Sequence, residues 1–372
     1  MHLDNNTRAF FALVKAGLWE QDVHLTSFNK IEFQEINRLA EEQTVVGLVA
    51  AGLEHVTDMK VSKEDLLQFV GRALQLEQRN ESMNNFVGCL VKKMHENGIY
   101  ALLLKGQGIA QCYERPQWRA PGDVDFFLSE DNYKKAFCFL SPLASSVENE
   151  NTYNKHIAMH IESFAVELHG TLRNGLWYSM DNALDSIQNE IFFGGAVRSW
   201  MNNSAQLFLP RADEDVVYVF SHILQHFYQE GVGLRQVCDW CRLLWTYKSS
   251  LNYGLLESRI RKMGILSKWK AFATLSVDYL GMPKEAMPFY SSSKIWKYKA
   301  NRIVAFILKT GNFGHNRDYS YYERYPYLVY KGISLWKHIV DFFKYFRVFP
   351  LNAMKVLRSI IINGASQVRR SR

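Results

Sequence analysis

The stretch at residues 101–128, ALLLKGQGIAQCYERPQWRAPGDVDFFL, limits the folds open to this chain more than any other segment. The short apolar run at 101–104 predicts a buried strand, and Lys105-Gly106 predicts the turn that ends it. A brief helix over 107–114 would then direct its unpaired backbone N–H groups at an anion held by the turn. We therefore expect a strand, a turn and a short helix around an anion site.

The end of this stretch predicts two carboxylates on one face of a strand. Side chains two apart in a strand share a face, so Asp123 and Asp125 project together while Val124 and Phe126 pack behind them. Adjacent ionised carboxylates repel each other, and a divalent cation removes the conflict. Mg²⁺ prefers such oxygen ligands and fills its shell with water and phosphate. The alternative is an edge strand with a solvated acidic face, because short motifs recur by chance.

A later pair of strands supplies a third carboxylate. Residues 155–162 and 165–172 predict a hairpin that turns at Ser163-Phe164. Glu167 shares a face of the second strand with His169, which makes Glu167 the candidate. Glu162 is the alternative, because strand boundaries predicted from sequence err by a few residues.

Three segments carry a resemblance to a known family: LLLKGQGIAQCYERPQWRAPGDVDFFL, VELHGTL and SHILQHFYQEGVGLRQVCDWCRLLW. A strand, a glycine turn, a short helix and a strand with Asp-hydrophobic-Asp resemble the active-site framework of the polymerase-β-like nucleotidyltransferases. More narrowly, the segments are similar to a bacterial family of uncharacterised nucleotidyltransferases over roughly residues 30–290. Most of that superfamily has Gly-Ser or Gly-Gly at the turn, whereas this chain has Gly106-Gln107, so a hydroxyl that often contacts phosphate is missing.

The resemblance implies an enzyme that moves a nucleoside monophosphate from an NTP, expected to be ATP, to an acceptor hydroxyl and releases pyrophosphate. Mg²⁺ is the expected cofactor, with Mn²⁺ as an alternative. Asp123 and Asp125 would bridge two ions, and Glu167 would complete the acceptor-side one and take the hydroxyl proton. The residues do not choose among a small molecule, a sugar, a peptide or a protein as acceptor. The residues expected to contact the nucleotide are Lys105, Gly106, Gln107 and Arg119, with a structural salt bridge as an equal alternative for Arg119.

The third segment predicts two helices with candidate substrate-binding residues. His222 and His226 are four apart, so both can face one ligand, but the metalloprotease pattern is absent. Arg235 and Asp239 have the same spacing. They form either an ion pair on a helix surface or part of a nucleotide or acceptor site. The resemblance favours the second interpretation, with a helical lobe that closes over the nucleotide from the side opposite the sheet.

The spacings of histidines and cysteines indicate a metal site less strongly than the carboxylates do. His156, His160 and His169 allow a metal site, but histidines spread over two strands are more often surface or hydrogen-bonded groups. Cys238 and Cys241 have C-x-x-C spacing inside a helical pattern without a second pair, which favours packed thiols over zinc.

The last segment changes composition. Residues 294–372 hold 16 Lys and Arg against three Asp and Glu, so they carry +13 while the first 293 residues carry −6. Interleaved aromatic residues suit a peripheral membrane surface, a nucleic acid or an acidic partner. Packing on the protein itself is the default interpretation of the amphipathic stretches on either side of Pro350, because a basic outer face is ordinarily a solvated one.

These observations predict an α+β protein with a small mixed β-sheet of nucleotidyltransferase type flanked by helical segments. The expected parts are an N-terminal helical segment (1–98), a catalytic core (99–210), a helical lobe (211–293) and the basic C-terminal region (294–372). The composition, 48% hydrophobic and 14% aromatic, excludes a disordered chain. No signal peptide or spanning apolar run is recognised, so a cytoplasmic location is expected, with membrane contact at most peripheral.

Two other functions remain open at this point. A non-catalytic nucleotide-binding or scaffold protein would keep the carboxylates without turnover. A nucleic-acid-directed enzyme is favoured only by the basic C-terminal region.

Overall fold

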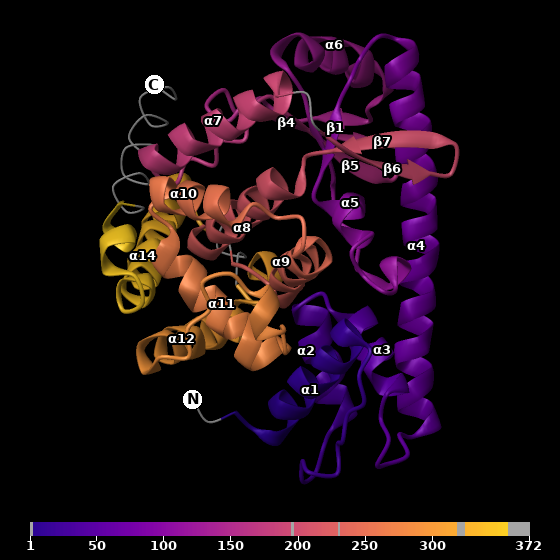
Figure 1. Ribbon diagram of the computed structural model, residues 1–372, viewed down its shortest axis with the longest axis vertical. Coiled ribbons are helices and arrows are strands. Elements are labelled where there is room, and N and C mark those ends of the chain that lie inside the picture. The colour runs from indigo at the N-terminus through magenta and orange to yellow at the C-terminus, as the bar shows by residue number, and fades with distance from the viewer. Residues whose placement is uncertain (1–2, 195–196, 230, 318–323, 356–372) are drawn as a thin grey trace.

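The computed structural model describes residues 3–194, 197–229, 231–317 and 324–355. In this part of the chain, a seven-stranded mixed sheet lies among helices (Figure 1). The strand order is β3-β4-β5-β2-β1-β7-β6. This arrangement confirms the predicted α+β class and the helical segments around a mixed sheet.

The N-terminal helices pack together beside the long helix α4 (Figure 1). The three packed helices are α1 (Asn5–Trp19), α2 (Phe33–Glu42) and α3 (Val46–Glu54), and α4 covers Lys63–Glu96. Glycines let α1 and α3 approach closely, because a Cβ at Gly17 would lie 1.9 Å from the carbonyl oxygen of Leu48. This contact leaves no room for a side chain.

The order of pairing places the D-x-D motif, Asp123-Val124-Asp125, at the centre of the sheet. β1 (Leu102–Leu104) is antiparallel to β2 (Val124–Phe127) and parallel to β7 (Ala205–Leu209). β2 is parallel to β5 (Phe164–His169). The outer strands are β3 (Ser146–Val147), β4 (His156–Ile161) and β6 (Arg198–Asn202).

The predicted hairpin is confirmed as β4 and β5, which pair in antiparallel fashion. Its turn lies at Glu162-Ser163, one residue earlier than predicted, because Phe164 is buried and already belongs to β5. The expectation for β2 also holds: Val124 and Phe126 are buried in an apolar cluster with residues of α4 and of α6 (Glu130–Leu140). The second face of β2 carries Asp125 and the buried Phe127, which belongs to the other apolar cluster.

The helix predicted over 107–114 is shorter than expected. α5 covers only Gly106–Ala110, after which the amides of Cys112 and Tyr113 bond to carbonyls three residues earlier. The carbonyl of Cys112 instead accepts a hydrogen bond from Arg242 Nε at 2.7 Å. This contact joins the segment after α5 to a distant helix.

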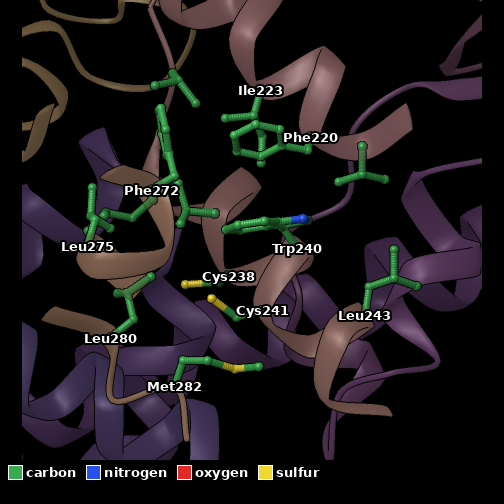
Figure 2. Packing of buried hydrophobic residues seen from close by; sticks show 14 of the residues in the cluster. Phe220, Ile223, Cys238, Trp240, Cys241, Leu243, Phe272, Leu275, Leu280 and Met282 are labelled. Atoms are coloured by element: carbon green, nitrogen blue, oxygen red, sulfur yellow. The ribbon is translucent and has the colours of Figure 1, made fainter. Parts of the chain in front are cut away.

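The helical lobe contains α8 (Ala212–Tyr228), α9 (Leu234–Tyr247), α10 (Tyr253–Met263) and α11 (Leu266–Leu280). Helix α7 (Tyr178–Phe193), which precedes the lobe in the chain, packs against α10 and α8. Figure 2 shows the sulfur atoms of Cys238 and Cys241 among apolar side chains, with Trp240 and Met282 close by. Both thiols are free and fully buried. The C-x-x-C spacing therefore belongs to a packed helix, as predicted.

The described part of the C-terminal region contains α12 (Lys294–Thr310) and α14 (Tyr327–Phe346). Tyr345, Val348 and Phe349 are buried against the lobe, so this region does pack on the protein itself. Trp336 and Phe343 of α14 are nevertheless exposed. Residues 318–323 and 356–372, which hold several of the basic and aromatic residues noted above, lie outside the described residues. No helix in the described ranges has the length and apolarity needed to cross a membrane.

Candidate functional site

The predicted third carboxylate lies beside the D-x-D motif. Asp123 immediately precedes β2, and Asp125 is the second residue of that strand. Asp125 lies directly opposite Glu167 in the parallel pair of β2 and β5. Residues that face each other across neighbouring strands point to the same side of a sheet. Strand pairing thus gathers three acidic residues, while Glu162 remains in the hairpin turn and does not line the polar cavity beside them.

Lys105 provides a cation next to these carboxylates. Its Nζ lies 2.9 Å from Asp125 Oδ1, and both side chains are largely buried. The turn that carries it is unusual, because Lys105 has φ 49° and ψ −139° and Gly106 has φ 40°. A positive φ is unfavourable for a residue with a Cβ, and such strain persists only where surrounding contacts hold it. Burial works to lower the pKa of Lys105, but the charge of Asp125 and further negative neighbours outweigh burial and raise that pKa.

Two histidines also contact these carboxylates, and one of them shares Asp125 Oδ1 with Lys105. His169 Nε2 lies 2.8 Å from Asp125 Oδ1 and 3.4 Å from Glu167 Oε2. His156 Nε2 lies 3.0 Å from Glu167 Oε2. Burial acts to raise the pKa of Glu167, but the hydrogen bonds from His156 and His169 hold it well below its usual range. Burial acts to lower the pKa of His169, and its hydrogen bonds to Asp125 and Glu167 raise it.

Asp123, which also lines the cavity, is exposed to solvent, whereas Asp125 is buried and Glu167 is half-buried. Desolvation of its carboxylate, followed by the charges of Glu167 and Asp125, raises the pKa of Asp123. The three acids are therefore close enough to interact electrostatically. Such mutual repulsion is what a bound cation relieves.

A polar cavity of about 830 Å³ lies between this cluster and α8. Helix α8 contributes Tyr218, His222 and His226, which lie on one stripe of the helix at intervals of four. Lys105 Nζ donates a hydrogen bond to His222 Nε2 at 3.2 Å, since an ammonium group has only donors. Burial, and then the charge of Lys105, lowers the pKa of His222 well below its usual value. His222 is therefore a neutral acceptor that positions Lys105.

His226 joins the same hydrogen-bonded chain. Its Nε2 lies 2.8 Å from His222 Nε2 and its ring packs edge-on against Phe313. Tyr218 stacks on His222, and burial raises the pKa of Tyr218 to about 12. Sequence analysis found the two histidines but missed the tyrosine, although its spacing of four from His222 was a usable indication.

A smaller cavity of about 50 Å³ adjoins the first at Lys105, Asp123 and His222. Of the residues expected to contact the nucleotide, Lys105, Gly106 and Arg119 line this cavity. Gln107 does not. Its side-chain amide donates instead to Asn84 Oδ1 at 2.6 Å and to Asn80 Oδ1 at 3.2 Å on α4.

Arg119 forms the structural salt bridge that sequence analysis kept as an alternative. Its Nε and Nη2 donate to the two oxygens of Asp239 at 2.7 and 2.8 Å, and Tyr113 Oη donates to the same carboxylate at 2.8 Å. Arg119 and Asp239 are both buried. The interpretation of Arg235 and Asp239 as an ion pair on a helix surface is therefore wrong, because neither is at the surface and Asp239 is occupied by Arg119.

Arg235 supports the loop that precedes the D-x-D motif. Its Nη1 donates to the carbonyl oxygens of Ala120 and Pro121 at 2.9 and 3.3 Å. A Cβ at Gly122 would lie 3.2 Å from the same nitrogen, so glycine allows this close approach. Burial, and then the charge of Arg119, lowers the pKa of Arg235. Arg235 thus positions the backbone that leads into Asp123.

Comparisons with known proteins identify one relationship. Residues 29–281 match the family described as uncharacterised nucleotidyltransferase. A search of curated proteins and a search of solved structures return no match. The matched range contains the strands with Asp125 and Glu167 and the helices with His222 and Arg235. The chain therefore belongs to the family of uncharacterised nucleotidyltransferases.

Proposed function

We propose that the cavity between the sheet and α8 is the active site of a Mg²⁺-dependent nucleotidyltransferase, and that the sheet is of the nucleotidyltransferase type. The reaction would transfer a nucleoside monophosphate from an NTP, expected to be ATP, to an acceptor hydroxyl and release pyrophosphate. The observation that carries this proposal is the register that sets Asp125 opposite Glu167, with Asp123 beside them.

The donor set fits a hard divalent ion. Asp123, Asp125 and Glu167 offer carboxylate oxygens to one site, where the ammonium group of Lys105 is the neighbouring cation. Oxygen ligands are those that Mg²⁺ prefers, and Mn²⁺ accepts them as well. When bound, the metal would neutralise charge on the phosphate oxygens and orient the reacting groups.

Individual residues around the cavity have separate roles in this proposal. Lys105, held in its charged form beside Asp125, would meet the phosphates at the turn. Glu167 would lie beside the acceptor and accept the proton of its hydroxyl group. Arg235 would keep the loop before Asp123 in place. His222 and His226 would contact the nucleotide or the acceptor from α8.

A test needs no knowledge of the acceptor. The purified full chain is incubated with each of the four NTPs, labelled at the α-phosphate, with Mg²⁺ or Mn²⁺ and a cell extract. We expect label to appear on a component of the extract together with pyrophosphate, and expect neither with the Asp125→Asn variant. Equal labelling by this variant and the natural chain would refute the proposal.

One observation favours a non-catalytic nucleotide-binding protein as the second candidate. Lys105 and His169 both contact Asp125 Oδ1, so part of the charge of the cluster is already compensated by groups of the chain itself. This candidate predicts binding of Mg²⁺–NTP without any pyrophosphate. The acceptor, the cytoplasmic location and a contact of residues 294–372 with a membrane or nucleic acid stay predictions.

A further inference from the structure

Two strands bring a second kind of ligand set into the cavity. His156 of β4 and His169 of β5 are direct partners across the antiparallel pair. Glu167 lies two residues before His169, so it projects from the same face. All three line the polar cavity. The pairing register therefore groups two imidazoles and one carboxylate.

The positions of their ligand atoms fit one metal ion. One nitrogen of each histidine and one oxygen of Glu167 all lie within 4.8 Å of one another. Glu167 Oε2 lies 3.0 Å from His156 Nε2 and 3.4 Å from His169 Nε2. Ligand atoms bonded at about 2.1 Å are about 3.0 Å apart in an octahedral shell and about 3.4 Å apart in a tetrahedral one. Both measured separations are thus compatible with a shared ion.

The chemistry of the ligands selects a class of ion. Mg²⁺ takes oxygen ligands, whereas imidazole nitrogen suits zinc and its first-row neighbours. Two histidines and a glutamate with an open side are typical of catalytic rather than structural zinc-type sites. The cavity provides that open side. Asp125 Oδ1 lies 2.8 Å from His169 Nε2, so the D-x-D motif is directly next to these three ligands.

We propose that His156, Glu167 and His169 bind a divalent first-row transition-metal ion of the Zn²⁺ class. The acceptor-side ion is then of this class, and Asp123 and Asp125 hold the Mg²⁺ that accompanies the nucleotide. The role of the ion rests on the proposed function, but its binding does not. Of the three histidines that sequence analysis considered, only His160 is outside the set, and Glu167 joins instead.

His160 offers a matched control. It lies on the same strand and the same face as His156, but it is exposed and does not line the cavity. His160→Ala therefore removes an imidazole from β4 and leaves the ligand set intact. Glu167→Gln keeps the shape of the side chain and removes the charge, so it tests the site even if His169→Ala does not fold.

The experiment titrates the metal-free full chain with Co²⁺, whose visible absorption changes when protein ligands replace water around the ion, and then displaces Co²⁺ with Zn²⁺. We expect one equivalent of Co²⁺ to give an absorption band that Zn²⁺ removes and that equimolar Mg²⁺ leaves unchanged. His156→Ala and Glu167→Gln should each weaken binding about tenfold or more, whereas His160→Ala should bind as the natural chain does. Absence of the band, or equal affinity in His156→Ala and His160→Ala, would overturn the inference.

Measuring both metal binding and NTP turnover on the same protein distinguishes this inference from the proposed function. Co²⁺ and Zn²⁺ binding at the three residues without any NTP turnover would overturn the transferase proposal alone. Turnover with Mg²⁺ in a chain that gives no Co²⁺ band would overturn the metal inference alone.

Discussion

Asp125 and Glu167 lie directly opposite each other on the parallel strands β2 and β5, although 42 positions separate them in the sequence. This relationship joins the D-x-D motif to a carboxylate from the hairpin. Because the two residues share a face of the sheet, a change at either one should affect the same step, the proposed transfer of the nucleoside monophosphate.

The first prediction concerns the carboxylates. Asp125→Asn and Glu167→Gln should each lower NTP turnover by on the order of 10²-fold or more, because each removes a charge expected to act in the transition state. Release of pyrophosphate measures this effect. Glu162→Gln is the matched control, since Glu162 belongs to the same hairpin but lies in its turn. A loss of similar size in Glu162→Gln would show that the effect is not specific to the site.

The second prediction concerns the contact between α1 and α3. Gly17→Ala should destabilise the protein by about 1–3 kcal/mol or more, because the new Cβ would collide with the Leu48 carbonyl oxygen, which cannot move aside freely. Gly71→Ala should instead stabilise by about 0.5–1 kcal/mol, because Gly71 lies inside α4 and a Cβ there would point into open space. Denaturant unfolding of the two variants compares them, and a Gly17→Ala protein as stable as the natural chain would contradict the close packing.

The third prediction is a pH dependence of stability that originates at Lys268. This buried residue of α11 has its pKa lowered to about 7 by burial and then by the charges of Lys355 and Lys299. Between about pH 7 and the ordinary lysine pKa of 10.5, the unfolded chain binds more protons at this residue than the folded one does. Its contribution to the free energy of unfolding should therefore rise with pH in that window, by about 1.4 kcal/mol per pH unit at the steepest.

Lys268→Met should remove this contribution. The variant should gain the most stability relative to the natural chain at about pH 7 and less at about pH 9.5, as thermal unfolding at both pH values would measure. Lys262→Met, at an exposed position of α10, serves as the control and should show no such trend. A stability difference for Lys268→Met that stays constant with pH would reject a lowered pKa.

The fourth prediction addresses the exposed aromatic residues of α14. Trp336 and Phe343 are 66% and 59% exposed on a basic segment, a combination that suits an anionic membrane surface. Replacing both by Glu should lower co-sedimentation with anionic vesicles several-fold. Leu67→Glu, on an equally exposed apolar side chain of α4, should leave it unchanged. Equal binding by all three proteins would discard the membrane contact.

Much of the site could be predicted because it depends on local periodicity. The alternation of side chains in a strand places Asp123, Asp125 and Glu167 correctly relative to their own strands. The hairpin of β4 and β5 follows from the same periodicity, and the family match agrees with the motifs that suggested it.

The parts that failed depend on partners far away in the sequence. Spacing suggested that Asp239 pairs with Arg235, yet the carboxylate binds Arg119 from a loop 120 residues earlier. The partner of His156 could not be inferred without the register of its hairpin. Likewise, the carbonyl of Cys112, just beyond the end of α5, accepts a hydrogen bond from Arg242 of α9. Periodicity carries no information on such contacts.

The ion pair of Lys105 and Asp125 has a consequence for how the protein takes up its ligands. Because the ammonium group of Lys105 already contacts Asp125, a metal that enters at this carboxylate would compete with it, and loading would be an exchange of one cation for another. The released side chain would then be free for an anion, so a triphosphate and its metal should enter cooperatively, each raising the affinity for the other.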